Sequence, residues 1–293
     1  MRYNDFFDFA SARHSIYLKK EAGEPRPWSN DEIFNNWYFT NVYRELDKTT
    51  EWFRENVRRD LQLRPEVIPA TMLFRWFNRI GIGETIFCQP DFENKTVFDS
   101  YMENRDINQM RGSIKYAHPQ GPYVNGAYII KAHNGMDKLS GVLRAFDEAM
   151  EYMDQWYGSH DHKGYAYFGE EMIAQPSMEA ATKTLSLCKF LGRFMAYEIV
   201  CDLRYTIYLS EALDKMTWAN PGPGARRGIN RVLGRDLKHG LTTKDAIGHM
   251  YDLRIKSVDY GWNDWEMREV EHTLCEFDKY ERIREGGRGK RRY

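Results

Sequence analysis

Residues 264–284 of this chain read DWEMREVEHTLCEFDKYERIR. The apolar side chains of this stretch are spaced three and four residues apart, at Met267, Val270, Leu274 and Phe277. That spacing places them on one face of an α-helix, whereas His272 and Glu276 lie one turn apart on the polar face. The stretch therefore predicts a long amphipathic helix near the end of the chain.

The same period recurs upstream, between breaks rich in Gly and Pro. Helical patterns cover residues 39–57, which follow a helix cap at 29–31, and residues 73–77, 139–153, 177–203, 229–233 and 245–255. Because the chain shows no internal repeat and no convincing sheet, we expect an all-α fold. The length of 293 residues allows one large domain or two helical lobes.

The other segments carry signals of irregular structure. Residues 1–29 mix aromatic and charged side chains with Pro25 and Pro27, and predict an irregular lead-in to a helical domain over 30–284. We interpret GIGE at 81–84 as a turn, and residues 112–130 as a long loop with a short strand at 128–130. Residues 285–293 are predicted to form a flexible basic tail.

Composition predicts a folded protein and does not by itself identify a partner. Apolar residues make up 42% of the chain and charged residues 29%, and the 15% of aromatic residues supplies core side chains and rings that could stack on bases. The net charge of −1 does not indicate a polyanionic partner for the whole molecule. Residues 282–293, RIREGGRGKRRY, contain six basic residues against one acidic residue, so this segment either lies on a phosphate backbone or stays solvated.

Several classes of site and location are not indicated. The cysteines are scattered without a metal or disulfide pattern, at Cys88, Cys188, Cys201 and Cys275. No P-loop, GxSxG or HExxH signature occurs, and His160-Asp161-His162 lacks a third metal ligand, so a solvated loop is expected there and no cofactor is predicted. With no bilayer-spanning apolar run and no signal-peptide pattern, we expect a cytoplasmic protein, in the host cytoplasm if a phage encodes it.

Residues 190–196, FLGRFMA, resemble half of a helix-hairpin-helix element. In that element a glycine turn opens a helix whose backbone N–H groups hold a DNA phosphate. Gly192 and Ala196 have the required spacing, whereas Phe190 stands where the first glycine is expected. The stretch predicts Gly192 and Arg193 as DNA contacts, with a helix corner in the core as the alternative.

Residues 226–233, RRGINRVL, resemble the stretch that follows the hairpin in DNA glycosylases of that superfamily. Arg226 stands where those enzymes have a catalytic Asp, and Phe194 where bifunctional members have a Lys. An Arg would oppose the positive charge of an oxocarbenium-like transition state. We therefore expect a glycosylase-like scaffold without N-glycosidic chemistry, in which Arg226 and Arg227 suit a phosphate or pyrophosphate leaving group.

Six blocks in order resemble the DNA base hypermodification family, namely NVYRELD (41–47), FNR (77–79), GAYII (126–130), YEI (197–199), residues 220–227 and VEHTLCEFDKYER (270–282). This helical domain is also found fused to 5-hydroxymethyldeoxyuridine DNA kinases, and it is grouped with the α-glutamyl/putrescinyl-thymine pyrophosphorylases. The resemblance covers the chain from about residue 30 to the C-terminus.

The resemblance implies a phage-type pathway that modifies thymine in DNA. There a kinase phosphorylates and pyrophosphorylates hydroxymethyluracil, and in the transferase clade an amine then displaces pyrophosphate from the 5-methylene carbon. The implied partners are DNA containing modified thymine, an amine co-substrate such as an amino acid or polyamine, and a separate 5-hydroxymethyluracil DNA kinase. A base within a duplex would be reached by flipping it into a pocket.

Such a displacement needs acid–base groups, cations for the leaving group and contacts to the base. The expected acid–base groups are Glu45, Asp47, His272 and Glu276. The expected substrate and pyrophosphate contacts are Arg44, Arg75, Asn78, Arg79, Tyr128, Arg226, Arg227 and Lys279. The expected DNA contacts are Gly192, Arg193, Arg231, Lys290, Arg291 and Arg292. The alternative for each is a structural role on a solvated face, in an ion pair or in the core.

Three functions are compatible with these residues. The first is a transferase that replaces the pyrophosphate of activated hydroxymethyluracil with an amine. The second is a non-catalytic module that recognises the modified base and works with the separate kinase. The third is a DNA glycosylase on a modified thymine. Amine-dependent turnover, binding without turnover and formation of abasic sites would distinguish the three.

Overall fold

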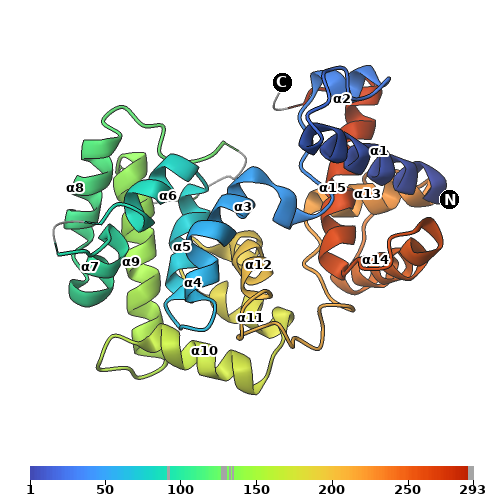
Figure 1. Ribbon diagram of the computed structural model, residues 1–293. Coiled ribbons are helices and arrows are strands. Elements are labelled where there is room, and N and C mark those ends of the chain that lie inside the picture. Colours follow the sequence, from blue (N-terminus) through green and yellow to red (C-terminus); the bar gives the residue numbers. More distant parts are fainter. Residues whose placement is uncertain (91–92, 127–130, 132, 134, 290–293) are drawn as a thin grey trace. The chain divides into compact units, whose positions relative to one another are not determined.

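The computed structural model describes residues 1–90, 93–126, 131, 133 and 135–289. These residues form helices and connecting loops without a strand, which confirms the predicted all-α fold for the described part of the chain (Figure 1). The chain divides into two compact units, in agreement with the two-lobe alternative. Unit 1 comprises Met1–Asp47 and Asp214–Tyr293, and unit 2 comprises Lys48–Leu213.

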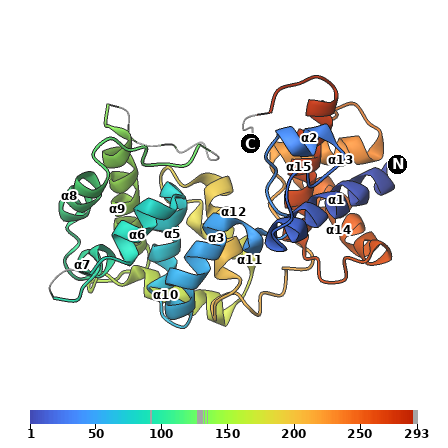
Figure 2. The same ribbon diagram turned by 45° about the horizontal axis from the view of Figure 1, so that its top comes forward.

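Unit 1 is built around its last helix. Its elements are α1 (Tyr3–Glu21), α2 (Glu32–Asn36), η1 (Arg44–Leu46), α13 (Pro223–Leu233), α14 (Thr243–Ser257), η3 (Val258–Tyr260) and α15 (Met267–Arg284). Helix α15 is the amphipathic helix expected at the end of the chain, and its apolar residues Val270, Leu274 and Phe277 are buried. Helices α1, α2, α13 and α14 all pack against it, and both views show α1 and α13 beside α15 (Figures 1 and 2).

The prediction that residues 1–29 are irregular was wrong for most of that segment. Helix α1 occupies Tyr3–Glu21, and its rings enter the core of unit 1. The Phe6 ring lies 5.7 Å from Phe277 and 6.2 Å from Trp265, both in edge-on contact. These contacts bury apolar surface that the local sequence pattern, broken by charges, did not reveal. Only the connection from residue 22 to residue 31, which contains both prolines, is irregular.

A glycine permits the close approach of α13 and α15. Gly228 lies on α13, and a Cβ at this position would stand 2.3 Å from the Leu274 carbonyl oxygen of α15. Gly224 lies one turn earlier on α13, and a Cβ at this position would stand 3.0 Å from Cys275 Sγ of α15. Because these neighbours include backbone atoms, they have no side-chain rotamer through which to yield. The two small residues therefore set the distance between the two helices.

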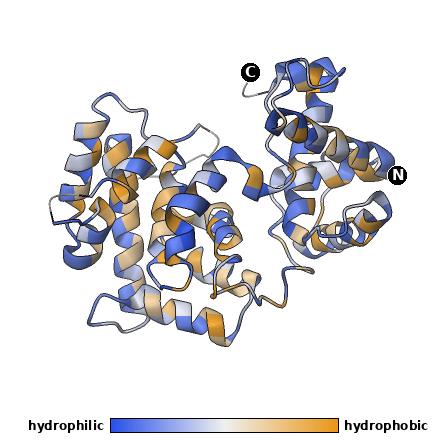
Figure 3. Ribbon diagram, in the orientation of Figure 1, coloured by the Kyte–Doolittle hydropathy of each residue, from blue (hydrophilic) through white to orange (hydrophobic). Residues whose placement is uncertain are grey.

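Unit 2 surrounds a helix that is buried on all sides. Its elements are α3 (Lys48–Phe53), the π-helical turn η2 (Arg54–Arg58), α4 (Arg59–Leu61), α5 (Val67–Phe77), α6 (Ile80–Phe87), α7 (Val97–Asn104), α8 (Ile107–Ala117), α9 (Lys138–Trp156), α10 (Gly164–Ala174), α11 (Met178–Leu185) and α12 (Gly192–Leu203). Every residue of α5 is buried, and this helix packs against α12 and α9. Most other helices carry both hydrophobic and hydrophilic residues, as expected for helices with one solvated face (Figure 3).

Four expected element boundaries were wrong. The pattern over 39–57 is not one helix, because residues 37–43 are non-helical and their backbone groups bond to side chains of unit 1. GIGE at 81–84 lies inside α6, and residues 112–117 belong to α8. The pattern over 177–203 is interrupted at 186–191 between α11 and α12. The expected strand at 128–130 lies outside the described residues.

Arg75, expected to hold a phosphate, is instead the centre of a buried polar network in unit 2. Its Nε and Nη2 atoms donate to the two carboxylate oxygens of Asp202 at 2.5 and 2.7 Å. It also donates to Asn78 Oδ1 at 3.0 Å and to Thr50 Oγ1 at 3.1 Å. Its side chain is 1% exposed and that of Asp202 is fully buried, so each charge neutralises the other inside the core.

Replacing Gly228 with Ala tests the helix crossing. The added Cβ would overlap the Leu274 carbonyl group, so Gly228→Ala is expected to lower the free energy of unfolding by about 2–3 kcal/mol. The matched control is Gly248→Ala on α14, where a Cβ would meet nothing within 4 Å. The control should raise stability by about 0.5–1 kcal/mol, since Ala is the better helix former. Urea unfolding of both variants measures this, and equal effects would contradict the crossing described here.

A second substitution separates a structural from a ligand-binding role for Arg75. Arg75→Met leaves Asp202 buried without its bidentate partner, with Arg58 at 3.6 Å, and should cost about 3–5 kcal/mol of stability. Arg79→Met, four residues after Arg75, removes the arginine that directly precedes α6 and should change stability by less than about 1 kcal/mol. A small effect of Arg75→Met on unfolding would restore the ligand-binding interpretation.

Candidate functional site

The non-helical segment Phe39–Asn41 lies against the polar face of α15. The Thr40 backbone N–H donates to Glu276 Oε2 at 2.9 Å. The Thr40 hydroxyl and His272 Nε2 share a hydrogen bond of 2.8 Å. His272 and Glu276, predicted from their spacing on the last helix, therefore both contact Thr40. Thr40 was not among the predicted site residues.

Arg13 of α1 holds this segment in place. Its Nε atom donates to the Phe39 and Thr40 carbonyl oxygens at 3.1 and 2.9 Å. Its Nη2 atom donates to the Phe39 carbonyl at 2.8 Å and to Asn41 Oδ1 at 2.6 Å. The side chain is only 3% exposed. Arg13 was not among the predicted site residues because residues 1–29 were expected to be irregular. It lies on the buried face of α1 with Phe6, Phe9 and Ile16.

Asp47 closes the segment from its other end. Its Oδ1 atom accepts the Asn41 backbone N–H at 2.9 Å. Burial raises the pKa of the Asp47 carboxyl to about 6, although the Asn41 N–H and the positive charges of Arg13 and Arg44 oppose the rise. The nearby negative charge of Glu276 raises this pKa further. The Glu276 carboxylate, the other predicted acid–base group with a carboxyl here, therefore lies close enough to act on the protonation of Asp47.

Lys279 completes the arrangement. Its Nζ atom donates to Glu276 Oε2 at 3.0 Å and lies 4.6 Å from the centre of the Phe39 ring. We call Thr40, Asp47, His272, Glu276 and Lys279 the acid–base cluster. It contains a hydroxyl, an imidazole, two carboxyl groups and an ammonium group, all around one segment of backbone. Such a set can accept and donate protons near neutral pH.

Two predicted residues border the cluster in η1. Arg44 is buried, with 4% exposure, and its charge lowers the pKa of Asp47. Glu45 is half-buried beside it. Their proximity to Asp47 follows from adjacency in the sequence, and their roles remain predictions.

The predicted arginines of α13 lie in unit 1 but bind protein groups. Arg226 donates to the Pro221 and Leu241 carbonyl oxygens and to Thr243 Oγ1, so it ties α13 to the start of α14. Arg227 donates to Asp278 Oδ2 at 2.8 Å and keeps 39% of its side chain exposed. Arg231, a predicted DNA contact, is 4% exposed and is bonded to Asp278 and Glu285.

The remaining predicted residues lie in unit 2 or outside the described residues. Asn78 is buried and ends α5 with a left-handed backbone, and Arg79 directly precedes α6. Gly192 and Arg193 are exposed at the start of α12. Both Phe190 and Gly192 have positive φ angles, of 66° and 59°, which is the backbone conformation that favours glycine. Tyr128, Lys290, Arg291 and Arg292 lie outside the described residues.

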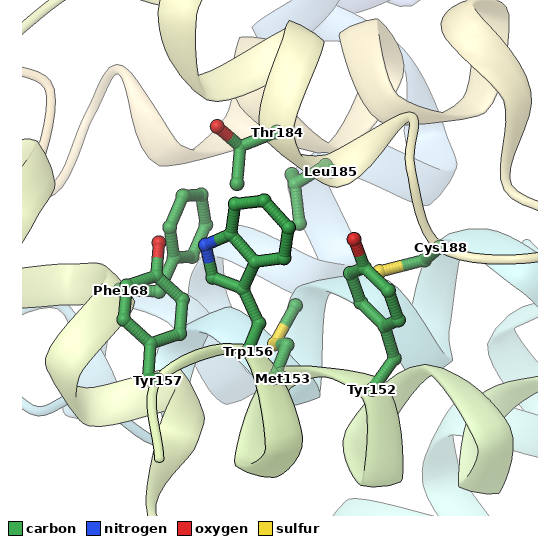
Figure 4. Close-up of a pocket in the computed structure, with 8 residues that line it drawn as sticks. All are labelled: Tyr152, Met153, Trp156, Tyr157, Phe168, Thr184, Leu185 and Cys188. Carbon is green, nitrogen blue, oxygen red and sulfur yellow. The ribbon is translucent and has the colours of Figure 1, made fainter.

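Two hollows in unit 2 lie apart from the acid–base cluster in the sequence. The first has a volume of about 10 Å³, which is room for no more than one water. It is lined by Trp156 and neighbouring aromatic side chains, and Thr184 and Leu185 of α11 face them (Figure 4). The second is an open hollow of about 390 Å³ beside Glu151, Asp154, His160 and His162. Among the described residues no group of three His, Cys, Asp or Glu side chains is placed to hold a metal ion.

The pH dependence of stability should report the buried state of Asp47. Its pKa in the folded protein is about 6, above the ordinary value of 3.8, so the folded state binds this proton more tightly than the unfolded chain. The stability from this group is therefore present at low pH and lost as the pH rises through about 4 to 6, by on the order of 2 kcal/mol.

Asp47→Asn should remove that loss, so the stability difference between wild type and variant should change across this pH window. Urea unfolding at several pH values between 4.5 and 7.5 measures it. The control Asp252→Asn removes an exposed carboxyl group on α14 and should leave the wild-type pH profile intact. Parallel profiles for wild type and Asp47→Asn would show that Asp47 titrates as an ordinary solvated carboxyl.

Comparison with known proteins places this geometry in a family. Residues 1–288 match the family model described as the 5-hmdU DNA kinase, helical domain. The chain is also similar to the 5-hmdU DNA kinase of Bacillus phage SP10, with 23% identity over 302 aligned positions. That alignment covers 94% of this chain but 44% of the relative, so the chain spans less than half the length of this kinase. No solved structure matches significantly.

The match begins at residue 1, so it includes α1 and Arg13 as well as the segment from residue 30 on which the resemblance rested. Within the described residues, no helix is both long and apolar enough to cross a membrane. A family model that matches nearly the whole chain establishes kinship. This chain belongs to the family of the helical domain of 5-hmdU DNA kinases, in a DNA hypermodification context.

Proposed function

We propose that this chain is a transferase that acts on pyrophosphorylated 5-hydroxymethyluracil in DNA and replaces the pyrophosphate with an amine. The acid–base cluster carries the proposal. A purely structural contact between Phe39–Asn41 and α15 would need only hydrogen-bonding groups of any kind. The contact instead gathers groups that can exchange protons, namely the His272 imidazole on Thr40 and the Asp47 carboxyl, whose pKa burial raises to about 6.

The proposed reaction requires one proton acceptor and one site for the leaving group. The amine nitrogen attacks the exocyclic 5-methylene carbon, a new C–N bond forms, and the C–O bond to pyrophosphate breaks. The proton released by the amine passes to a basic group of the cluster. His272 and Glu276 are the candidates because both already accept or share hydrogen bonds with Thr40 at 2.8–2.9 Å.

The leaving pyrophosphate requires positive charge that is accessible. Arg75, Arg226 and Arg231 are engaged with protein groups in buried or structural positions, so we omit them from the leaving-group site. Lys279 is bonded to Glu276 within the cluster, and Arg227 is half-exposed on Asp278, the residue before Lys279. These two cations are the proposed pyrophosphate contacts.

The α11–α12 hairpin is the proposed phosphate contact for the DNA strand. Gly192 at the start of α12 is exposed, and a Cβ there would meet nothing within 4 Å, so a phosphate can approach the backbone. The positive φ angle of Phe190, where the helix-hairpin-helix element has a glycine, supports the same backbone course. Arg193 follows on the exposed side of the turn.

A non-catalytic recognition module is the second candidate. It is favoured by the similarity to a relative that is named a kinase and is more than twice as long, because the chemistry of that protein can lie outside the shared part. In that case the cluster would bind the modified base, and a separate kinase would act on it.

Mass spectrometry of nucleosides distinguishes these functions. DNA carrying pyrophosphorylated hydroxymethyluracil is incubated with the protein and a pool of amino acids and polyamines, then digested. The transferase predicts a new amine-substituted thymidine. Glu276→Gln should keep the Thr40 hydrogen bond and lower the rate about 100-fold or more, since general acid–base groups contribute about 10²–10⁴.

Glu211→Gln, which removes an exposed carboxyl group from unit 2, is the matched control and should keep the wild-type rate. If the activated nucleoside stays intact although the protein binds the DNA, the transferase is contradicted and the recognition module is supported. Abasic sites would indicate a glycosylase instead.

A further inference from the structure

A second feature of unit 1 is a concentration of positive charge at the two ends of α2. Residues 19–28 and 282–292 together contain nine basic and three acidic residues, whereas the whole chain has 42 basic and 43 acidic residues. One segment ends three residues before Asp31, the N-cap of α2, and Asp31 accepts a hydrogen bond of 2.5 Å from Tyr280 of α15. Within the described residues, Lys19, Lys20 and Arg26 precede α2 in the sequence, and Arg288 is next to Gly289, which packs on the C-cap of α2.

In the first segment Trp28 contacts three cations, two through its indole ring and one through its backbone carbonyl group. The Lys20 Nζ atom lies 4.5 Å from the Trp28 ring centre, and the Arg26 guanidinium carbon 4.7 Å from it. Lys19 donates to the Trp28 carbonyl oxygen at 3.0 Å, and the Trp28 indole N–H donates to the Glu24 carbonyl oxygen at 2.7 Å. These cation–π contacts hold the two cations against the face of the ring. These side chains lose less entropy on binding an anion because they are already ordered.

The second segment is fixed at the other end of α2. Gly289 packs on Trp37, the C-cap of α2, so closely that a Cβ would stand 2.4 Å from the indole ring. It also approaches Ile283 of α15, at 3.0 Å from that Cβ position. The chain thus reaches residue 289 beside Trp37, three residues before Thr40 of the acid–base cluster.

We propose that this part of unit 1, which we call the α2 surface (Lys19, Lys20, Arg26, Trp28, Arg288 and Gly289), binds the sugar–phosphate backbone of DNA. The inference rests on the proposed function, because it names the surface that would hold the strand next to the acid–base cluster. Lysine and arginine side chains bind the phosphate backbone of DNA independently of its base sequence. Glu21 and Glu24 lie in the same segment and lower the net charge of residues 19–28 to +1. The proposed contact is therefore made by the individual cations and not by a field of the whole segment.

The salt dependence of DNA affinity tests the α2 surface. Binding of a duplex containing 5-hydroxymethyluracil is measured by fluorescence anisotropy between 50 and 200 mM KCl, with wild type and Lys20→Gln/Arg26→Gln. Each lost phosphate contact lowers the slope of log affinity against log salt by about 0.9, so the double variant should lose about 1.8 and bind about tenfold more weakly or worse. The matched control is Lys238→Gln/Lys244→Gln, which removes the same charge from exposed positions near α14.

A third variant tests the anchoring without removing charge. Gly289→Val would force the chain away from Trp37, and it should weaken DNA binding at least about threefold with an unchanged melting temperature. If Gly289→Val binds DNA as tightly as the wild type, residues 288–289 are not part of the α2 surface. Equal slopes for the two double variants would overturn the proposal itself.

The outcome is independent of catalysis. If the α2 surface is wrong but the amine-substituted thymidine still forms, the transferase stands with a different DNA contact. If the slope falls as expected and no product forms, the α2 surface stands and the chain is a recognition module. Absence of any DNA affinity in the wild type would overturn both.

Discussion

The hydrogen bond from the Thr40 backbone N–H to the Glu276 carboxylate joins residues that are 236 positions apart in the chain. Its consequence is that Phe39–Asn41 cannot continue the helical pattern on either side, because its backbone groups are used by Arg13, Asp47 and α15. The same hydrogen bonds therefore interrupt the helix and assemble the acid–base cluster. Unit 1 depends on it, since both ends of the chain must be present before either the segment or the polar face of α15 has its partners.

Burial and pairing separate the arginines into two groups with different physical roles. A charge that leaves water must be compensated, and a buried Arg is therefore a poor candidate for an exchangeable ligand. Arg75 compensates Asp202 in unit 2, and Arg231 compensates Asp278 in unit 1. Arg227 shares Asp278 but stays half-exposed. Residue type alone would assign all three to phosphate, whereas the exposed fraction of each side chain decides which can exchange partners.

The arrangement within unit 1 links the chemistry to a strand of DNA. The acid–base cluster and the α2 surface include opposite ends of the 28–40 segment, and residues of α15 contact both. The close crossing of α13 over α15 at Gly228 leaves the opposite side of α15 for Thr40 and the cluster. A rigid helix that carries stability on one face and titratable groups on another holds those groups at defined distances, which acid–base chemistry requires.

The sequence by itself determined the all-α fold and the long last helix, and it indicated Asp47, His272, Glu276 and Lys279 as candidate site residues. Helical periodicity is a local property, and the last three of these residues share a single helix face, so their mutual placement follows from 3.6 residues per turn. The interpretation of α1 as irregular and of 39–57 as one helix failed for the opposite reason. Both depend on contacts with α15, more than 200 residues away, and a local pattern contains no information about such partners. Arg13, Thr40 and the buried state of Arg75 were decided only by tertiary structure, because hydrogen bonding and desolvation are set by what surrounds a side chain in space.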